Sequence, residues 1–208
     1  QNLTINPLTA SNGEVNKVCL LIYDVTEFAS SKRALERANE KLAKLSMTDR
    51  LTGLLNRGTW ENLVDAEYER YRRYGQATTL VMFDIDHFKP VNDNYGHLAG
   101  DEVIRHTAQT TRNNIRQSDS AGRYGGEEFG IILPETDAEN ARLLCERIRE
   151  SIEKSTVETS AGNITYTISM GIAQLTDEPE NYMQWMQKAD EALYAAKESG
   201  RNKVVVGE

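Results

Sequence analysis

Hydrophobic and polar positions follow one another in distinct blocks along the chain, and these blocks predict alternating helices and strands. Residues 77–85 (ATTLVMFDI) form a continuous apolar run, which is typical of a central strand buried on both faces. Apolar residues recur at helical spacing in four segments, 61–74, 100–115, 138–154 and 182–197. Further strands are expected as a hairpin over 122–134, a strand over 163–175 and a closing strand over 203–207. The pattern therefore predicts an α/β fold with a mixed central β-sheet flanked by helices.

The first 28 residues have a different pattern. Two short strands, within LTI and VCLLIYDV, flank Asn12-Gly13, which is a strong hairpin signal. A hairpin of this size makes no core of its own. The segment KVCLLIYDVTEFASSKRALE resembles the last strand and exit of a PAS domain, whose usual ending is a D-[IV]-T-E run into a helix. Residues 1–28 are therefore expected to be the C-terminal remnant of a PAS sensory domain.

Residues 29–46 are rich in charge, with a narrow apolar seam. The seam has three- and four-residue spacing over about two and a half heptads, and consists of Phe28, Leu35, Ala38, Leu42 and Leu45. One interpretation is a single amphipathic helix lying on its own domain. The other, which we favour, is a signalling helix that pairs with a second copy as a parallel coiled coil. Residues 47–208 would then be the output domain, and the chain would form a homodimer through the helix.

Composition and charge narrow the class of protein. The 208 residues are 39% hydrophobic and 27% charged, as in soluble globular proteins. No apolar run approaches the ~20 residues of a membrane span, and there is no signal peptide, so we expect a cytoplasmic fragment of a longer protein without direct membrane contact. Cys19 and Cys145 lack metal-ligand spacing and are expected to be reduced, buried thiols. The net charge of −8 argues against binding to a nucleic-acid polymer.

Two acidic stretches contain the candidate metal-binding carboxylates. Asp84 and Asp86 lie two residues apart where the apolar strand meets its loop, so period two directs both side chains to one face. Glu127 and Glu128 follow two glycines in RYGGEEFGIIL, and glycine is typical of tight turns because it adopts positive φ readily. Taken separately, these carboxylates would be interpreted as a strand end and a solvated turn. Together they predict a site for a hard divalent cation such as Mg²⁺.

The order of the motifs identifies a family. The segment GGEEF resembles the signature of GGDEF-domain diguanylate cyclases in its common Glu variant. The resemblance covers residues 49–206 and includes DRLTGLLNR, FDIDHFKPVNDNYGHLAGDEVI, SMGIA and ADEALYAAKESGRNKV. It implies a palm-like nucleotide cyclase architecture and condensation of two GTP to cyclic di-GMP and pyrophosphate. Two Mg²⁺ per active site, with Mn²⁺ as the alternative, would assist attack of each 3′-hydroxyl on an α-phosphate.

The resemblance also assigns residues to roles. Metal would be bound by Asp84, the Ile85 carbonyl, Glu127 and Glu128, and Glu127 with Glu128 would be the catalytic carboxylates. The substrate-binding residues implied are Phe88, Lys89, Asn92, His97, Asp101, Gly125, Gly126, Lys197 and Arg201. Asn92 and Asp101 would read guanine. Lys197 and Arg201 fit contacts to the triphosphate, although cations also favour the C-terminus of any helix.

A second nucleotide site is implied by RQSD, residues 116–119. These residues fit the R-x-x-D inhibitory site of the family, at which Arg116 and Asp119 would bind cyclic di-GMP, with Arg147 as a secondary arginine. The alternative is a surface ion pair worth under ~1 kcal/mol.

Three other interpretations of the whole chain stay open from the sequence. The first is a silent relative that binds GTP or cyclic di-GMP without turnover, although no signature carboxylate or glycine is missing. The second is a dimerisation module with incidental acidic loops. The third is a cyclase that makes a monocyclic nucleotide. No G-x-x-x-x-G-K-[ST] loop occurs, so the triphosphate would depend on metal.

Overall fold

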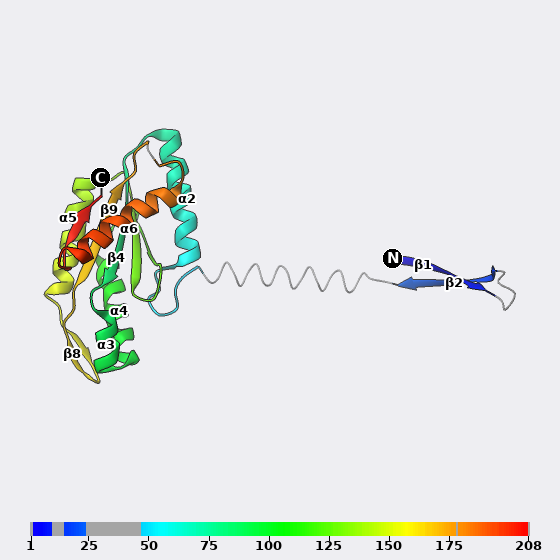
Figure 1. The fold of residues 1–208 in the computed structure, drawn as a ribbon, viewed down its shortest axis with the longest axis horizontal. Helices are drawn as coiled ribbons and strands as arrows, with labels where there is room; N and C mark the ends of the chain where they lie inside the picture. Colours follow the sequence, from blue (N-terminus) through cyan, green and yellow to red (C-terminus); the bar gives the residue numbers. More distant parts are fainter. Residues whose placement is uncertain (1, 10–14, 24–46, 178, 208) are drawn as a thin grey trace. The chain divides into compact units, whose positions relative to one another are not determined.

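A computed structural model of the protein describes residues 2–9, 15–23, 47–177 and 179–207. The chain divides into two units, 1–46 and 47–208. In the first unit β1 (Asn2–Thr9) pairs antiparallel with β2 (Val15–Tyr23), so both predicted strands are confirmed (Figure 1). The Asn12-Gly13 turn, the exit after Tyr23 and the predicted signalling helix over 29–46 lie outside the described residues.

The second unit is built on a mixed six-stranded sheet, as the sequence pattern predicted. Its strand order is β10-β9-β4-β6-β5-β3. The two outer pairs, β10 with β9 and β3 with β5, are parallel, while the inner pairs are antiparallel. The strands are β3 (Leu55–Asn56), β4 (Thr78–Ile85), β5 (Ser120–Arg123), β6 (Glu128–Pro134), β9 (Ile168–Gln174) and β10 (Val204–Val206).

Helices cover both faces of this sheet, and each of the four predicted helices is confirmed with shifted ends. They are α2 (Arg57–Tyr74), α4 (His97–Asn114), α5 (Ala138–Glu153) and α6 (Tyr182–Glu198), with a short α3 (Phe88–Tyr95) in addition. The α2 helix begins earlier than predicted because the Asn56 side chain caps it by accepting a hydrogen bond from Thr59 N. No helix in the described part of the chain is long and apolar enough to cross a bilayer.

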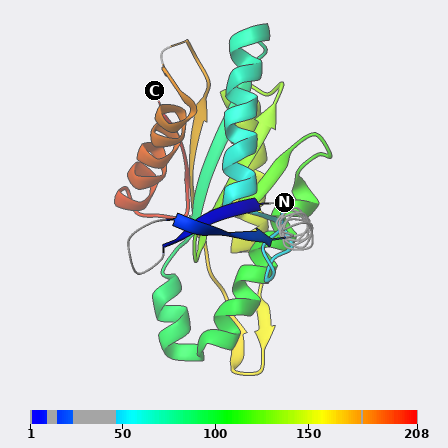
Figure 2. The same cartoon turned by 90° about the vertical axis from the view of Figure 1, so that its right-hand side faces the viewer.

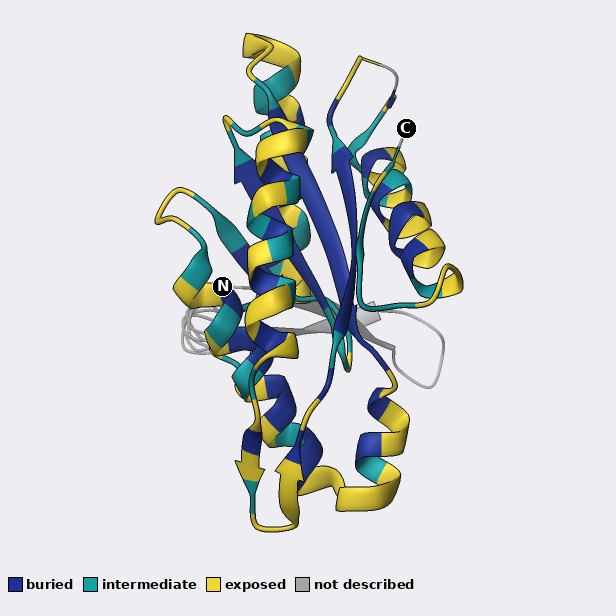
Figure 3. Cartoon of the chain, turned by 90° about the vertical axis from the view of Figure 1, so that its left-hand side faces the viewer, coloured by how far each residue is buried: buried dark blue, intermediate teal, exposed yellow. Residues whose placement is uncertain are grey.

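The period-two alternation of β4 divides the core into two layers. Val81, Phe83 and Ile85 pack with α4 and α5 on one face. Leu80 and Met82 pack with α2 and α6 on the other. Figure 3 shows the buried strands between helices whose outer surfaces are exposed. The whole β4 strand is therefore buried, which explains its unbroken apolar sequence.

The predicted strand over 163–175 is wrong as a single element. It is divided into β9 and β8 (Gly162–Ile164), and β8 pairs with β7 (Val157–Thr159) in a separate hairpin. The hairpin projects beyond the sheet beside α3 (Figures 1 and 2). The division has a clear cause: β9 pairs with β4 only as far as Ile168, opposite Ile85, where β4 ends.

Candidate active site

Asp84 occupies the end of the central strand and is only 6% exposed. It lies directly opposite Glu128 of β6 and Ser169 of β9. Opposed residues of antiparallel strands direct their side chains to the same face, so Asp84 and Glu128 share the face covered by α2 and α6. Lys197 approaches from α6, with its Nζ atom 3.0 Å from Asp84 Oδ2. The structure thus brings together three of the residues predicted for the site.

The β5–β6 turn holds the two glutamates beside the end of β4. The turn is closed by Tyr124 N and Gly125 N, which donate to the carbonyl oxygen of Glu128 at 2.8 and 3.1 Å. Ile85 N donates to the carbonyl oxygen of Glu127 at 3.3 Å, which links the turn to β4. The acidic stretches, about forty residues apart in the chain, therefore meet at one end of the sheet.

The signature glycines have a different structural role from the one the turn argument predicted. Among the described residues, positive φ occurs at five glycines, and neither Gly125 nor Gly126 is one of them. A Cβ at Gly125 would instead lie 2.3 Å from the Glu128 carboxylate, whereas a Cβ at Gly126 would meet nothing within 4 Å. Gly125 thus leaves room for the carboxylate of Glu128, and the turn is open on the Gly126 side.

Arg123 holds the shape of this turn, and no role for it was predicted from the sequence. Its guanidinium donates to the carbonyl oxygens of Gly125 and Gly126, at distances between 2.6 and 3.1 Å. Its Nη1 atom also contacts both carboxylate oxygens of Asp49 at 3.3 Å. Both residues belong to motifs that carried the family resemblance, and their spacing of 74 residues concealed the contact.

Burial and neighbouring charges raise the proton affinity of the acidic groups. Desolvation, opposed by Lys197 and assisted by Glu127 and Glu128, raises the pKa of Asp84 to about 6. Desolvation and the nearby Glu128 also raise the pKa of Glu127, despite the opposing charge of Lys197. A cation placed among these carboxylates would offset the free-energy cost of keeping them ionised.

Asp86 has its oxygens engaged by the protein. Its Oδ1 accepts from Ser169 Oγ at 2.7 Å, and its Oδ2 accepts from Thr167 Oγ1 and Asn202 N at 2.7 and 3.0 Å. Asp86 therefore ties β4 to β9 and to the segment after α6. In the described part of the chain, no three His, Cys, Asp or Glu side chains form a ready-made metal site. A metal here would thus need ligands from backbone carbonyl or phosphate oxygens.

The residues predicted to bind the guanine, ribose and phosphates of the substrate on the β4 side lie on α3 and the start of α4. Phe88 is buried at the first position of α3, and Asn92 lies one turn later. Asp101 follows Gly100 in the first turns of α4, and both Asn92 and Asp101 are half-buried. Lys89 and His97 are exposed beside them. These residues therefore lie along α3 and the first turns of α4, the elements that follow β4 in the chain.

Arg201 lies just beyond the last helix, in the turn that follows Lys197 and Glu198. The helix ends at Glu198, and Gly200 and Arg201 then adopt positive φ values of 113° and 62°. The backbone N–H of Arg201 donates to the carbonyl oxygen of Ala196 at 3.0 Å. Arg201 is thus held by a tight turn.

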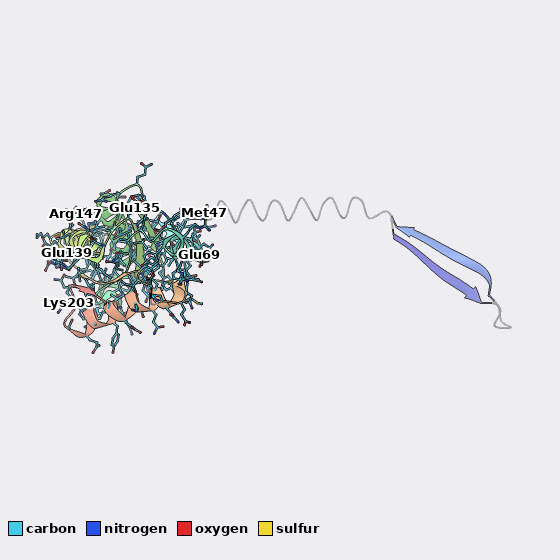
Figure 4. All side chains as sticks on the ribbon, turned by 90° about the horizontal axis from the view of Figure 1, so that it is seen from above. Met47, Glu69, Glu135, Glu139, Arg147 and Lys203 are labelled. Atoms are coloured by element: carbon cyan, nitrogen blue, oxygen red, sulfur yellow. The ribbon has the colours of Figure 1, made fainter. Side chains whose placement is uncertain are left out.

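The RQSD residues form a turn beside a separate cavity of about 360 Å³. Asp119 Oδ2 accepts from Arg116 N at 2.8 Å, which closes the turn. Arg147, from α5, is held against Asn114 by hydrogen bonds of 2.8 and 2.9 Å. Arg116, Asp119 and Arg147 line the cavity together with Glu135, and Figure 4 shows Arg147 and Glu135 on one edge of the unit. The structure therefore brings the three predicted residues around one space.

Cys145 is a free, buried thiol in α5, as predicted. The side chain of Cys19 lies outside the part of the chain that can be described.

Comparison with known proteins shows the family of this chain. Residues 46–203 match the family model described as diguanylate cyclase, GGDEF domain. The chain is 37% identical to the probable diguanylate cyclase DgcC of Escherichia coli K12, over 87% of this chain and 47% of that protein. It is 39% identical to the response regulator PleD of Caulobacter vibrioides, over 78% of this chain and 36% of that protein.

A solved structure has the same fold. The GGDEF domain of DgcB from Caulobacter crescentus, in complex with c-di-GMP, aligns with a TM-score of 0.75 and 35% identity, covering 78% of this chain and 93% of that one. The chain thus contains an α/β domain with a group of carboxylates at one end of its central strand. It belongs to the diguanylate cyclase GGDEF-domain family. It spans about half or less of the length of the curated relatives that it matches.

Proposed function

We propose that residues 47–208 act as a diguanylate cyclase that condenses two GTP to cyclic di-GMP with release of two pyrophosphates. The proposal depends chiefly on one observation, the pairing of Asp84 with Glu128 across the central strands. This pairing brings the acidic turn to the end of a buried strand, beside a lysine of α6. The family membership and the complete GGEEF signature support the same activity.

The donor set fits a hard divalent cation. Asp84, Glu127 and Glu128 offer carboxylate oxygens, and Ile85 offers a backbone carbonyl, which are ligands that Mg²⁺ prefers. Mg²⁺ is commonly held by one or two carboxylates together with substrate phosphates, so a full site is expected only with GTP present. Two such ions, or Mn²⁺ in their place, would supply charge stabilisation and lower the pKa of the attacking hydroxyl.

The chemistry is a double phosphoryl transfer. The 3′-hydroxyl oxygen of each GTP forms a bond to the α-phosphorus of the other, and the bond from that phosphorus to the bridging oxygen of the β-phosphate breaks. Pyrophosphate leaves with the bonding electrons. The hydroxyl proton is accepted by Glu127, whose raised pKa makes it a better base than an ordinary glutamate. Glu128 is assigned to metal binding beside it.

The remaining residues would bind and orient the nucleotide. Asn92 and Asp101 would read the guanine edge, with Phe88, Lys89 and His97 beside the ribose and phosphates. Lys197 and Arg201 would contact the triphosphate. Lys197 now neutralises Asp84, so a bound cation would release its ammonium group for phosphate. The open side of Gly126 allows the nucleotide to approach the backbone of the turn.

The cavity beside the RQSD turn would bind cyclic di-GMP as an inhibitor. Two arginines, Arg116 and Arg147, and two carboxylates, Asp119 and Glu135, line this one space. The arginines suit the phosphates of the ligand, because Arg binds phosphate bidentately, and a carboxylate suits its guanine edge. The bound c-di-GMP in the DgcB structure supports this class of ligand for the fold.

One domain supplies one set of these residues, so the reaction needs two domains facing each other. The partner would be a second copy of the chain. Residues 29–46 would bring the two domains together as a signalling helix, and residues 1–28 would be the PAS remnant that precedes it.

The test is incubation of the protein with Mg²⁺ and GTP, followed by chromatographic separation of the nucleotides. Cyclic di-GMP with pyrophosphate supports the proposal, and cyclic GMP supports the monocyclase. Unchanged GTP supports a silent binding module or a dimerisation module, which are distinguished by GTP binding. Glu127→Gln is the matched control, because it keeps the shape of the side chain and removes the base. This variant is expected to bind GTP with turnover reduced at least ~10²-fold.

A further inference from the structure

Gly100 lies in the first turns of α4, where its backbone conformation does not require a glycine. Its φ is helical, unlike that of the nearby Gly96, which is 83°. Glycine lowers helix stability relative to alanine, so a buried helical glycine points to a need for space.

The space at Gly100 is filled by a predicted guanine-reading residue. A Cβ on Gly100 would lie 2.0 Å from Asn92 Oδ1 and 3.1 Å from Asn92 Cγ. It would also lie 3.2 Å from the Cζ atom of Phe88. The carboxamide of Asn92 therefore rests directly against the α4 backbone, with the ring of Phe88 beside it.

The backbone around this contact is held firmly. Gly96 N donates to the carbonyl oxygen of Asn92 at 2.9 Å, and Gly100 N donates to the carbonyl oxygen of Gly96 at 3.2 Å. These bonds connect α3 to α4 across their junction. An added methyl group would thus displace the free end of the Asn92 side chain, because the two backbones are tied together.

We propose that Gly100 is a positioning residue that determines nucleotide specificity. Because Gly100 has no side chain, the Asn92 carboxamide has room to lie at the angle at which it hydrogen-bonds guanine. This inference rests on the proposed function, in which Asn92 contacts the base. An amide offers a donor and an acceptor on fixed sides, so rotating it changes which purine edge it matches. Sites that read a base by hydrogen bonds lose discrimination steeply when one partner is misplaced.

The first experiment compares Gly100→Ala with wild type in the full chain. Affinities for GTP and ATP are measured by calorimetry in Ca²⁺, and steady-state rates in Mg²⁺. We expect GTP affinity to fall at least about tenfold in G100A, ATP affinity to change less, and KM to rise by a larger factor than kcat falls. An unchanged GTP-to-ATP affinity ratio in G100A would overturn the proposal.

Gly58→Ala is the matched control. Gly58 is also a helical glycine, near the start of α2, but a Cβ there would approach no closer than 3.9 Å to Asn56 Oδ1. G58A is expected to bind both nucleotides as wild type does. An equal loss of GTP affinity in G58A would show that any extra methyl group in a helix has this effect, and would also overturn the proposal.

A double-mutant cycle tests whether G100A lowers GTP affinity by displacing the Asn92 side chain. In an Asn92→Ala background, G100A should reduce GTP affinity by less than twofold further, because the displaced group is already absent. Additive losses would contradict the proposal. If G100A alone does not fold, recovery of folding in the double variant identifies the Asn92 amide as the obstruction, and failure of both to fold overturns it. Absence of GTP binding in wild type would instead refute the proposed function, and this inference with it.

Discussion

The guanidinium Nη1 atom of Arg123 lies 3.3 Å from both carboxylate oxygens of Asp49. Asp49 is held in turn by Thr52, whose backbone N and Oγ1 donate to Oδ1 at 2.9 and 2.7 Å. Although burial opposes ionisation, the bonds from Thr52 and Arg123 keep the pKa of Asp49 below its usual value. Because Arg123 also donates to the glycine carbonyls of the turn, this contact connects the first loop of residues 47–208 to the acidic turn.

Arg123→Lys should therefore reduce catalysis through the position of the turn. A lysine keeps the charge but cannot donate simultaneously to two carbonyls and a carboxylate in the planar geometry of arginine. We expect kcat to fall about 10- to 100-fold, with a smaller change in KM for GTP. Arg142→Lys, which alters an exposed ion pair with Glu139 on α5, is the control and should behave as wild type. An R123K enzyme with wild-type kcat would show that the turn keeps its shape without the hydrogen bonds of the guanidinium group.

The sequence predicted the elements of this fold better than it predicted the contacts among them. Helices and the central strand follow from local periodicity, and the family motifs placed Asp84 and Glu127 correctly near one another. The sequence could not show the Arg123–Asp49 contact, because it depends on parallel pairing of β3 with β5. Nor could it show that β9 loses its partner where β4 ends, which divides the predicted strand.

The sequence around the two signature glycines also did not predict their structural role. The sequence predicts positive φ at Gly125 and Gly126, whereas the structure places Glu128 against Gly125 and open space beside Gly126. Such a requirement for space depends on a side chain three residues away and on its rotamer. It becomes visible only when the side chains are in place.

The stability of the metal-free protein should depend on Asp84 between about pH 4 and pH 6. The pKa of Asp84 is about 6 in the folded state, whereas the ordinary pKa of an aspartate side chain, which applies to the unfolded chain, is 3.8. The folded state therefore binds more protons in this range, so the free energy of unfolding falls as the pH rises. The shift corresponds to about 3 kcal/mol at most. Below about pH 4 Asp84 is protonated in both the folded and the unfolded state, so it no longer lowers the free energy of unfolding.

Asp84→Asn isolates that contribution, since asparagine does not titrate. Urea unfolding of both proteins at a series of pH values in EDTA gives the difference in free energy of unfolding. We expect D84N to gain stability relative to wild type as the pH rises from about 4 to 6, with a plateau above that range. A difference that is flat with pH would mean that Asp84 is ionised throughout.

Arg116→Ala should relieve product inhibition and leave turnover in the absence of product unchanged. Arg116 lines the RQSD cavity and not the acidic site, so its loss should affect only bound cyclic di-GMP. A hydrogen-bonded charge of this kind contributes about 1.5–3 kcal/mol, so the inhibition constant should rise at least about tenfold. The measurement is initial rate against added cyclic di-GMP. Arg105→Ala, which removes an exposed pair with Glu102, should leave the inhibition curve unchanged. An identical curve for R116A would remove Arg116 from this role.

Removal of residues 1–45, so that the chain begins at Ser46, should make activity depend on protein concentration. The reaction needs two domains in contact, and a dimerising helix gives them an effective concentration on the order of millimolar. Without it, the rate per chain should fall at micromolar concentration and rise with each increase in protein, while the rate per chain of the intact protein stays constant over the same range. Fusion of residues 46–208 to an unrelated parallel dimeric coiled coil should restore part of the lost activity. Equal specific activity of the truncated and intact chains at every dilution would show that residues 47–208 associate productively by themselves.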